Sequence, residues 1–224
     1  MVINEVKEAE RILETHKYNK LSSAVSLLVR YYIQIKELNK DETKENIKEF
    51  LRIHNEEFDY WEKSVNRMIK NANKYPLCQI DEIPITQSEI DTIYKAGSEK
   101  KEKILFTFLV LGKLKWMRSG KAWVNDTGAS TFKMANAETK AVDRDFIIKD
   151  FKEAGFISYA QSPMNMSIHV DFIDNNSDTI LTIKDLRNLG YRWLKIKGQR
   201  YAECNNCGIL FKPSRMNNCY CKNC

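Results

Sequence analysis

The chain is poor in the two residues that mark fibrous and low-complexity sequences. Of its 224 residues, 8 are glycine and 4 are proline, which excludes a collagen-like chain and a disordered Pro- or Gly-rich chain. Its longest apolar run, residues 104–111, is also far shorter than the ~20 residues of a membrane-spanning helix. Hydrophobic residues at 43% and charged residues at 29% indicate a folded globular chain.

The N-terminal end lacks the features of a secretory signal. Its first ten residues carry Glu5, Glu8 and Glu10 instead of a basic start followed by an apolar stretch. We therefore expect a cytoplasmic protein with no membrane partner.

Residues typical of catalysis are scarce and scattered. The histidines, His16, His54 and His169, are isolated, and the sequence has no phosphate-binding glycine loop or nucleophile elbow. Three aspartates between residues 171 and 178 would suit a metal nuclease, but residues 174–178 (DNNSD) are more typical of a turn between a strand and a helix. We expect a binding protein and not an enzyme.

Positive charge is concentrated at the C-terminal end. Residues 185–224 contain eight Lys or Arg residues against two acidic ones, which equals the whole net charge of +6. Clustered cations attract nucleic acid because they displace counterions from phosphates. The residues that we expect to contact DNA or RNA are Arg187, Arg192, Lys195, Lys197, Arg200, Lys212 and Arg215.

Aromatic residues alternate with these cations, and two interpretations stay open. Tyr191, Trp193 and Tyr201 could stack on bases while the cations hold the phosphates. In the alternative, Tyr191, Trp193 and Leu194 pack the C-terminal module onto the preceding domain and the charges face water.

Cysteines are concentrated in the same region. Five of the six lie in the last twenty-one residues, and the spacing CxxC occurs twice. Two such pairs can supply the four thiolates of a tetrahedral zinc site. We predict one structural Zn²⁺ held by Cys204, Cys207, Cys221 and Cys224; Cys219 is surplus, and a register with Cys219 in place of Cys221 stays open, as does a redox dithiol.

The pattern of apolar residues predicts a mostly α protein with small β elements (α+β). Residues 1–75 read as a helical domain of amphipathic helices, the third beginning at Asp41, and residues 76–84 as a linker. Residues 85–184 follow the order helix, short strand, helix, helix, hairpin, which is typical of a winged-helix-like domain. Residues 185–224 form the basic four-cysteine module.

Within the winged-helix-like region, two charged segments bear on nucleic-acid binding. The helix at the position that reads DNA, residues 143–153, has a net charge of −1, which disfavours major-groove reading. A second basic group, Lys113, Lys115, Arg118 and Lys121, surrounds the end of the expected core helix.

Seven segments of the chain are distinctive together: residues 85–93, 103–116, 123–125, 132–136, 186–198, 204–212 and 220–224. They resemble a family of proteins from phages and mobile elements of Gram-positive bacteria, and the resemblance covers nearly the whole chain. The family's cysteine pattern corresponds to the four predicted ligands, from which Cys219 is a departure. The resemblance implies the architecture and a phage context, but it implies no mechanism.

Two functions are consistent with these features. The leading hypothesis is a zinc-containing nucleic-acid-binding accessory or regulatory protein of a phage or mobile element. The alternative is a module that binds and modulates a host machine, such as a polymerase or a defence nuclease, without reading DNA. Dimerisation through the amphipathic N-terminal helices also stays open.

Overall fold

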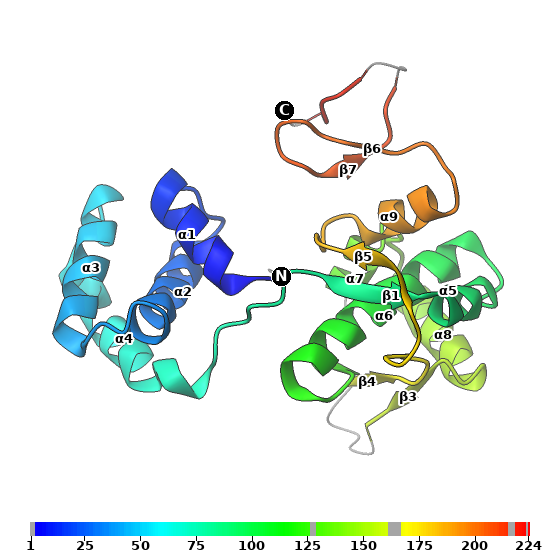
Figure 1. Cartoon of the computed structure of the whole chain (residues 1–224), viewed down its shortest axis with the longest axis horizontal. Helices are drawn as coiled ribbons and strands as arrows, with labels where there is room; N and C mark the ends of the chain where they lie inside the picture. Colours follow the sequence, from blue (N-terminus) through cyan, green and yellow to red (C-terminus); the bar gives the residue numbers. More distant parts are fainter. Residues whose placement is uncertain (1–2, 126–128, 161–166, 215–217, 223) are drawn as a thin grey trace. The chain divides into compact units, whose positions relative to one another are not determined.

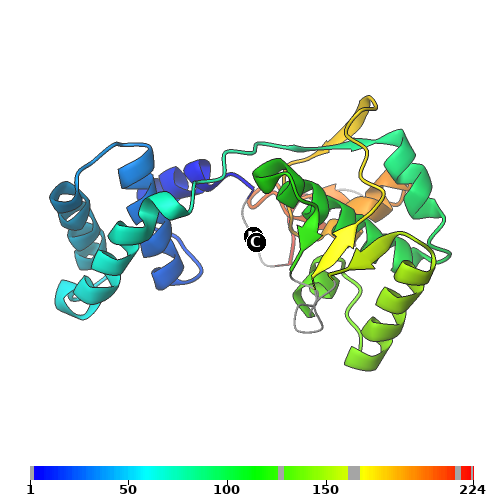
Figure 2. The same cartoon turned by 90° about the horizontal axis from the view of Figure 1, so that it is seen from below.

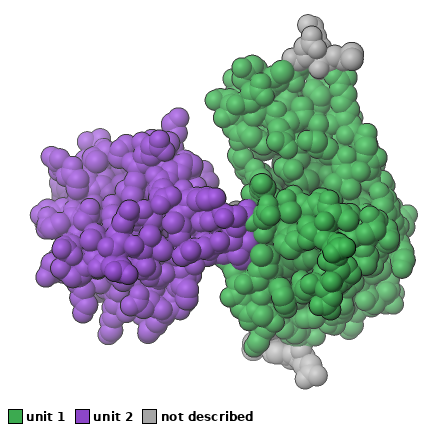
Figure 3. Space-filling model, viewed as in Figure 1, with its two compact units in different colours: residues 1, 82–224 green, residues 2–81 purple. Residues whose placement is uncertain are grey.

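The computed structural model describes residues 3–125, 129–160, 167–214, 218–222 and 224. The chain divides into two compact units (Figure 3): the first consists of residues 2–81 and the second of residues 82–224. Helices predominate and the strands form small sheets, so the expected α+β class is confirmed. In the described parts of the chain, no helix combines the length and the apolar character that crossing a bilayer requires.

The first unit consists of helices packed around one apolar core. Its elements are α1 (Glu5–Thr15), α2 (Leu21–Gln34), α3 (Lys40–Ile53), α4 (Phe58–Asn71) and the 3₁₀ turn η1 (Ala72–Lys74) (Figure 1). Helix α2 contacts α1, α3 and α4 and is buried along most of its length. Helix α3 begins one residue earlier than expected because Asn39, not Asp41, caps it in a capping box with Glu42.

The segment expected as a linker, residues 76–84, is largely structured. Leu77 and Cys78 are buried in the first unit, where the Leu77 N–H donates to Gln34 Oε1 (2.8 Å) and the Cys78 N–H donates to Glu5 Oε2 (2.8 Å). At the other end, Ile83 and Pro84 belong to a strand of the second unit. Side chains distant in the sequence thus satisfy backbone groups at the first end of this segment, and the two units divide within it, between residues 81 and 82.

The second unit contains the order of elements that the sequence predicts for a winged helix. They are α6 (Glu99–Ser119), β2 (Trp123–Val124), α7 (Ala129–Met134), α8 (Ala141–Glu153), β3 (Ile157–Tyr159) and β4 (Ile168–Val170), preceded by α5 (Gln87–Tyr94). The three strands form an antiparallel sheet in the order β2-β4-β3 (Figure 2). Every residue from Ile104 to Leu114 is buried, so α6 is the central core helix, as expected.

A second, two-stranded sheet is absent from the sequence-based prediction. Strand β1 (Ile83–Thr86) pairs antiparallel with β5 (Thr179–Ile183). Asp174 forms the expected turn, since its carboxylate accepts the N–H groups of Asn176 and Ser177, but the turn leads into a strand and not a helix. The pairing partner lies in the presumed linker, too far away in sequence for a local pattern to indicate it.

The residues on both sides of the boundary expected at residue 185 belong to one compact unit. Helix α9 (Leu189–Ile196) packs against α6 and buries Trp193 completely, with its ring near those of Phe106 and Tyr94. A Cβ at Gly190 would lie 1.8 Å from the carbonyl oxygen of Ala135, so only glycine permits this approach of α9 to α7. The short hairpin of β6 (Ala202–Glu203) and β7 (Leu210–Phe211) follows.

Candidate metal centre

The first CxxC pair lies in the turn between β6 and β7. The Cys204 N–H donates to the carbonyl of Ile209 (3.0 Å), and the Gly208 N–H donates back to the carbonyl of Cys204 (2.8 Å). Gly208 has a φ of 69°, a left-handed conformation in which glycine is free of Cβ strain. The turn therefore holds Cys204 and Cys207 on one side of the backbone, as a metal knuckle requires.

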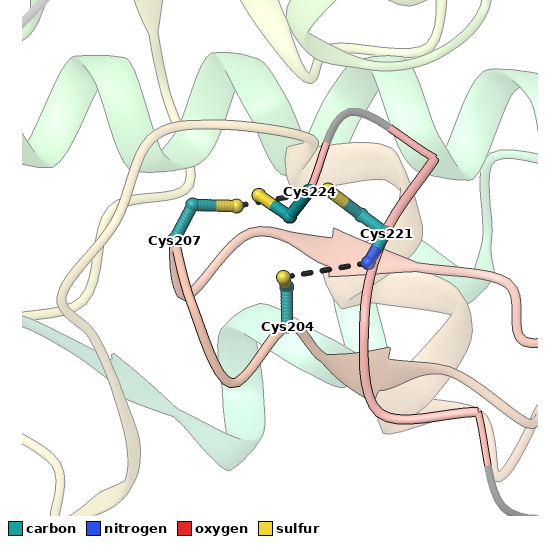
Figure 4. A group of neighbouring side chains, drawn as sticks. All are labelled: Cys204, Cys207, Cys221 and Cys224. Atoms are coloured by element: carbon teal, nitrogen blue, oxygen red, sulfur yellow. Dashed lines mark hydrogen bonds between the residues drawn. The ribbon is translucent and has the colours of Figure 1, made fainter.

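The second CxxC pair faces the first. The N–H of Cys221 points at Cys204 Sγ (3.4 Å), and the N–H of Cys224 donates to the carbonyl of Cys221 (3.1 Å). The four sulfur atoms converge on a common centre (Figure 4) and all lie within 4.8 Å of one another. The sequence-predicted set of four cysteines is thus brought together.

The spacing of the sulfurs fits a tetrahedral ion. With metal–sulfur bonds of about 2.3 Å, the sulfurs of a tetrahedral zinc site lie about 3.8 Å apart. The sulfurs of Cys207 and Cys221 are 3.7 Å apart. The other sulfur–sulfur distances are at most 4.8 Å.

Hydrogen bonds within the cluster shift the pKa values of two of the thiols in opposite directions. Backbone N–H groups of Cys221 and Cys207 lower the pKa of Cys204 to about 6 because they stabilise its thiolate. Hydrogen bonds with the Cys207 and Cys221 sulfurs raise the pKa of Cys224 to about 12. Four negative charges cannot gather at this spacing unless a cation neutralises them, which is the role of a bound metal.

Residues before α9 fasten the first knuckle to the rest of the unit. Arg187 donates to the carbonyl of Cys207 (2.8 Å) and forms a two-pronged ion pair with Asp185. Asn188 donates to the carbonyl of Leu210 (2.9 Å) and accepts from Asn136 (3.1 Å). The sequence analysis assigned no role to Asn188, which adopts a left-handed backbone conformation (φ 53°) that asparagine tolerates better than most residues.

Cys219 has a different place from the four. It is exposed, and its carbonyl accepts the N–H of Asn205 (2.9 Å). Within the described residues, the group of sulfurs that could hold an ion contains Cys221 and not Cys219. The geometry thus favours the register with Cys221.

Four of the cations expected to contact nucleic acid take part in ion pairs inside the unit. Arg187 pairs with Asp185, while Arg192 (3.6 Å) and Lys195 (3.5 Å) lie near Glu203. Lys197 donates to Glu102, which also accepts the Trp193 Nε1–H. Trp193 and Leu194 are buried, so packing, and not base stacking, explains these two side chains.

The remaining predicted contacts have different surroundings. Arg200 and Lys212 are exposed, and Lys195 keeps nearly half of its side chain exposed despite its ion pair. Arg215 lies outside the described residues. In the second basic group, Lys113 is buried in an ion pair and does not contribute to a surface patch.

Helix α8 exposes apolar as well as charged side chains. Val142 and Phe146 lie one turn apart and are 63% and 61% exposed, while Ile147, Ile148 and Phe151 face the core. The exposed face of α8 is therefore mixed, with aspartates beside an aromatic ring.

Sequence reasoning also missed a buried ion pair in the second unit. Lys113 Nζ lies 2.8 Å and 3.0 Å from the two carboxylate oxygens of Glu89, and both side chains are almost fully buried. The carboxylate further accepts the N–H groups of Thr86 and Asp174 (2.9 Å each). Because a lysine and a glutamate are usually exposed, no local pattern indicates that this pair is internal.

No protein-family model, curated protein or solved structure matches this chain.

Proposed function

We propose that the four cysteines hold one structural Zn²⁺ and that the protein is a nucleic-acid-binding accessory or regulatory protein of a phage or mobile element, active in the cytoplasm. The convergence of four sulfurs carries the zinc assignment, since a set of four thiolates at this spacing suits zinc. Four protein ligands leave no position open for water or substrate. The protein then acts by binding and not by catalysis.

The zinc orders the region that carries the net positive charge. Arg200 and Lys212 flank the hairpin that bears the first knuckle, and both are exposed. Loss of the metal would release this hairpin, because so short a segment has little apolar core of its own. Exposed cations on a fixed hairpin favour contact with a phosphate backbone.

Contact with the backbone is favoured over the reading of bases. Helix α8 would have to enter the major groove in a winged helix that reads sequence, but it exposes Asp143 and Asp145 there. Acidic side chains repel phosphates, and neither Val142 nor Phe146 supplies the hydrogen bonds that distinguish bases. We therefore propose binding with little sequence preference, directed by the zinc-containing hairpin.

A mobility-shift assay at several salt concentrations tests this proposal. The double variant Arg200→Glu/Lys212→Glu should lower the affinity for DNA or RNA and reduce the slope of log affinity against log salt by about 2, roughly 0.9 for each phosphate contact. The control Lys63→Glu/Lys70→Glu makes the same change in net charge on the exposed surface of α4. No shift with any nucleic acid, or equal loss in both double variants, would refute the proposal.

A second candidate function rests on the exposed apolar face of α8. Val142 and Phe146 present a pair of anchors at helical spacing, which is typical of a helix that docks in a groove of another protein. In this function the protein modulates a host machine, such as a polymerase or a defence nuclease. Val142→Ser/Phe146→Ser should abolish co-purification of that partner. If Arg200→Glu/Lys212→Glu abolishes co-purification and Val142→Ser/Phe146→Ser does not, α8 is not the docking helix.

A further inference from the structure

The helical unit contains a pocket that none of the functions above uses. It lies between α2 and α4, which pack against each other (Figure 1), and has a volume of about 390 Å³. Ser26 and Arg30 line it from α2, and Arg67, Met68 and Asn71 line it from α4. Tyr75 lies at its edge. This volume is at the lower end of the ~300–1,000 Å³ of small-molecule pockets.

One of the two arginines is held in place by the protein. Arg30 forms a two-pronged ion pair with Glu5 (2.7 Å and 3.3 Å), and its Nη1 also reaches the carbonyl of Tyr75 (3.5 Å). The pair is partly buried, with side chains about one-fifth exposed. A guanidinium has five N–H groups, so two remain beyond these three contacts. Arg30 can therefore bind a further acceptor without leaving Glu5.

The other arginine supplies a charge that no described residue of the unit neutralises. Arg67 is exposed, and within the described residues its guanidinium has no ion-pair or hydrogen-bond partner. None of the described residues that line the pocket is acidic. Since Glu5 balances Arg30, the pocket retains about one positive charge and favours an anion.

The uncharged residues that line the pocket indicate which kind of anion it favours. The Ser26 hydroxyl can donate to an oxygen, as can the second N–H of the Asn71 amide, whose nitrogen already donates to the Arg67 carbonyl (3.0 Å). A guanidinium matches two phosphate oxygens at once. Met68 adds an apolar side chain to the lining, and Tyr75, which is 65% exposed, adds an aromatic residue whose ring could stack on a flat group. An anion with a flat organic part fits this combination better than a free inorganic ion.

We propose that the pocket between α2 and α4 binds a small phosphomonoester with a flat organic group, of the nucleoside monophosphate class. The phosphate lies between Arg67 and Arg30 with Ser26, and the base lies against Tyr75. The site uses no residue of the metal centre, so its function does not depend on the zinc or on nucleic-acid binding.

Isothermal titration calorimetry of the full-length protein with adenosine monophosphate tests the proposal. We expect saturable binding by the parent, and a loss of about 10- to 100-fold in affinity for Arg67→Gln, as for the removal of a charge-assisted hydrogen bond. Lys70→Gln is the matched control, because Lys70 is exposed on the same helix but does not line the pocket. Adenosine should bind much more weakly than the monophosphate.

Three results would overturn the proposal. They are the absence of binding at millimolar adenosine monophosphate, an affinity that Arg67→Gln leaves unchanged, and equal binding of adenosine and its monophosphate. Thermal unfolding of both variants confirms that they fold, which the exposure of Arg67 and Lys70 leads us to expect.

Discussion

Replacement of Lys113 by methionine should strongly destabilise the second unit. The substitution keeps the length of the side chain but removes the ammonium group that lies 2.8 Å from the Glu89 carboxylate. Glu89 is fully buried and would keep only the N–H groups of Thr86 and Asp174 as donors. Removal of one partner of a buried ion pair costs about 3–5 kcal/mol, because the other charge is left uncompensated.

Denaturant and thermal unfolding of the full chain would measure this loss. A loss of that size corresponds to roughly 6–20 °C in the melting temperature of a unit of this length. Lys100→Met is the matched control: Lys100 is exposed on the same helix and should change the stability by less than about 0.5 kcal/mol.

The double variant separates charge from packing. Because Glu89→Gln removes the uncompensated charge, Lys113→Met/Glu89→Gln should be more stable than Lys113→Met alone by about 1–3 kcal/mol. The reasoning fails if Lys113→Met lies within about 1 kcal/mol of the parent, or if the double variant is the least stable of the three proteins.

Two further predictions concern the metal centre and the helical unit. Arg187→Ala removes the donor to the Cys207 carbonyl and should weaken zinc binding about 10- to 100-fold, as measured by competition with a chelator. Lys212→Ala is the control and should leave the zinc affinity unchanged. Equal zinc affinities of the two variants would contradict a supporting role for Arg187. Burial, with the nearby His16, lowers the pKa of His54, so the unfolded chain takes up this proton more readily than the folded one. The free energy of unfolding of the helical unit should therefore be highest above the unfolded pKa of 6.5 and should decrease as the pH falls below it. Denaturant unfolding between pH 5 and 8 should show that the free energy of unfolding depends less on pH for His54→Phe than for the parent. An unchanged pH dependence would exclude His54 as the cause.

The features that the sequence predicted correctly are those with a short-range signal. The CxxC spacing indicated which four cysteines converge, because two residues between ligands suit one tight turn. The apolar run from Ile104 to Leu111, interrupted only by Thr107, indicated the buried helix α6. The order of elements from α6 to β4 indicated the winged-helix arrangement, and the strand order β2-β4-β3 agrees with it.

The features that it missed depend on contacts between distant segments. The first two residues of β1, Ile83 and Pro84, were assigned to the linker because the strand's partner, β5, lies almost a hundred residues later. The cations near α9 were expected to face a ligand, but Glu102 on α6 pairs with Lys197 and accepts from Trp193. An acidic residue elsewhere in the fold can neutralise a basic cluster, and charge counting along the chain does not detect this.

The zinc content of the purified full-length protein tests the central claim most directly. Elemental analysis of protein kept under reducing conditions should give one zinc ion per chain, and X-ray absorption should give four sulfur neighbours at about 2.3 Å. Cys221→Ser should lose most of the metal, whereas Cys219→Ser should retain it. A parent protein without stoichiometric zinc, or a Cys219→Ser variant that loses zinc as Cys221→Ser does, would contradict the proposed centre.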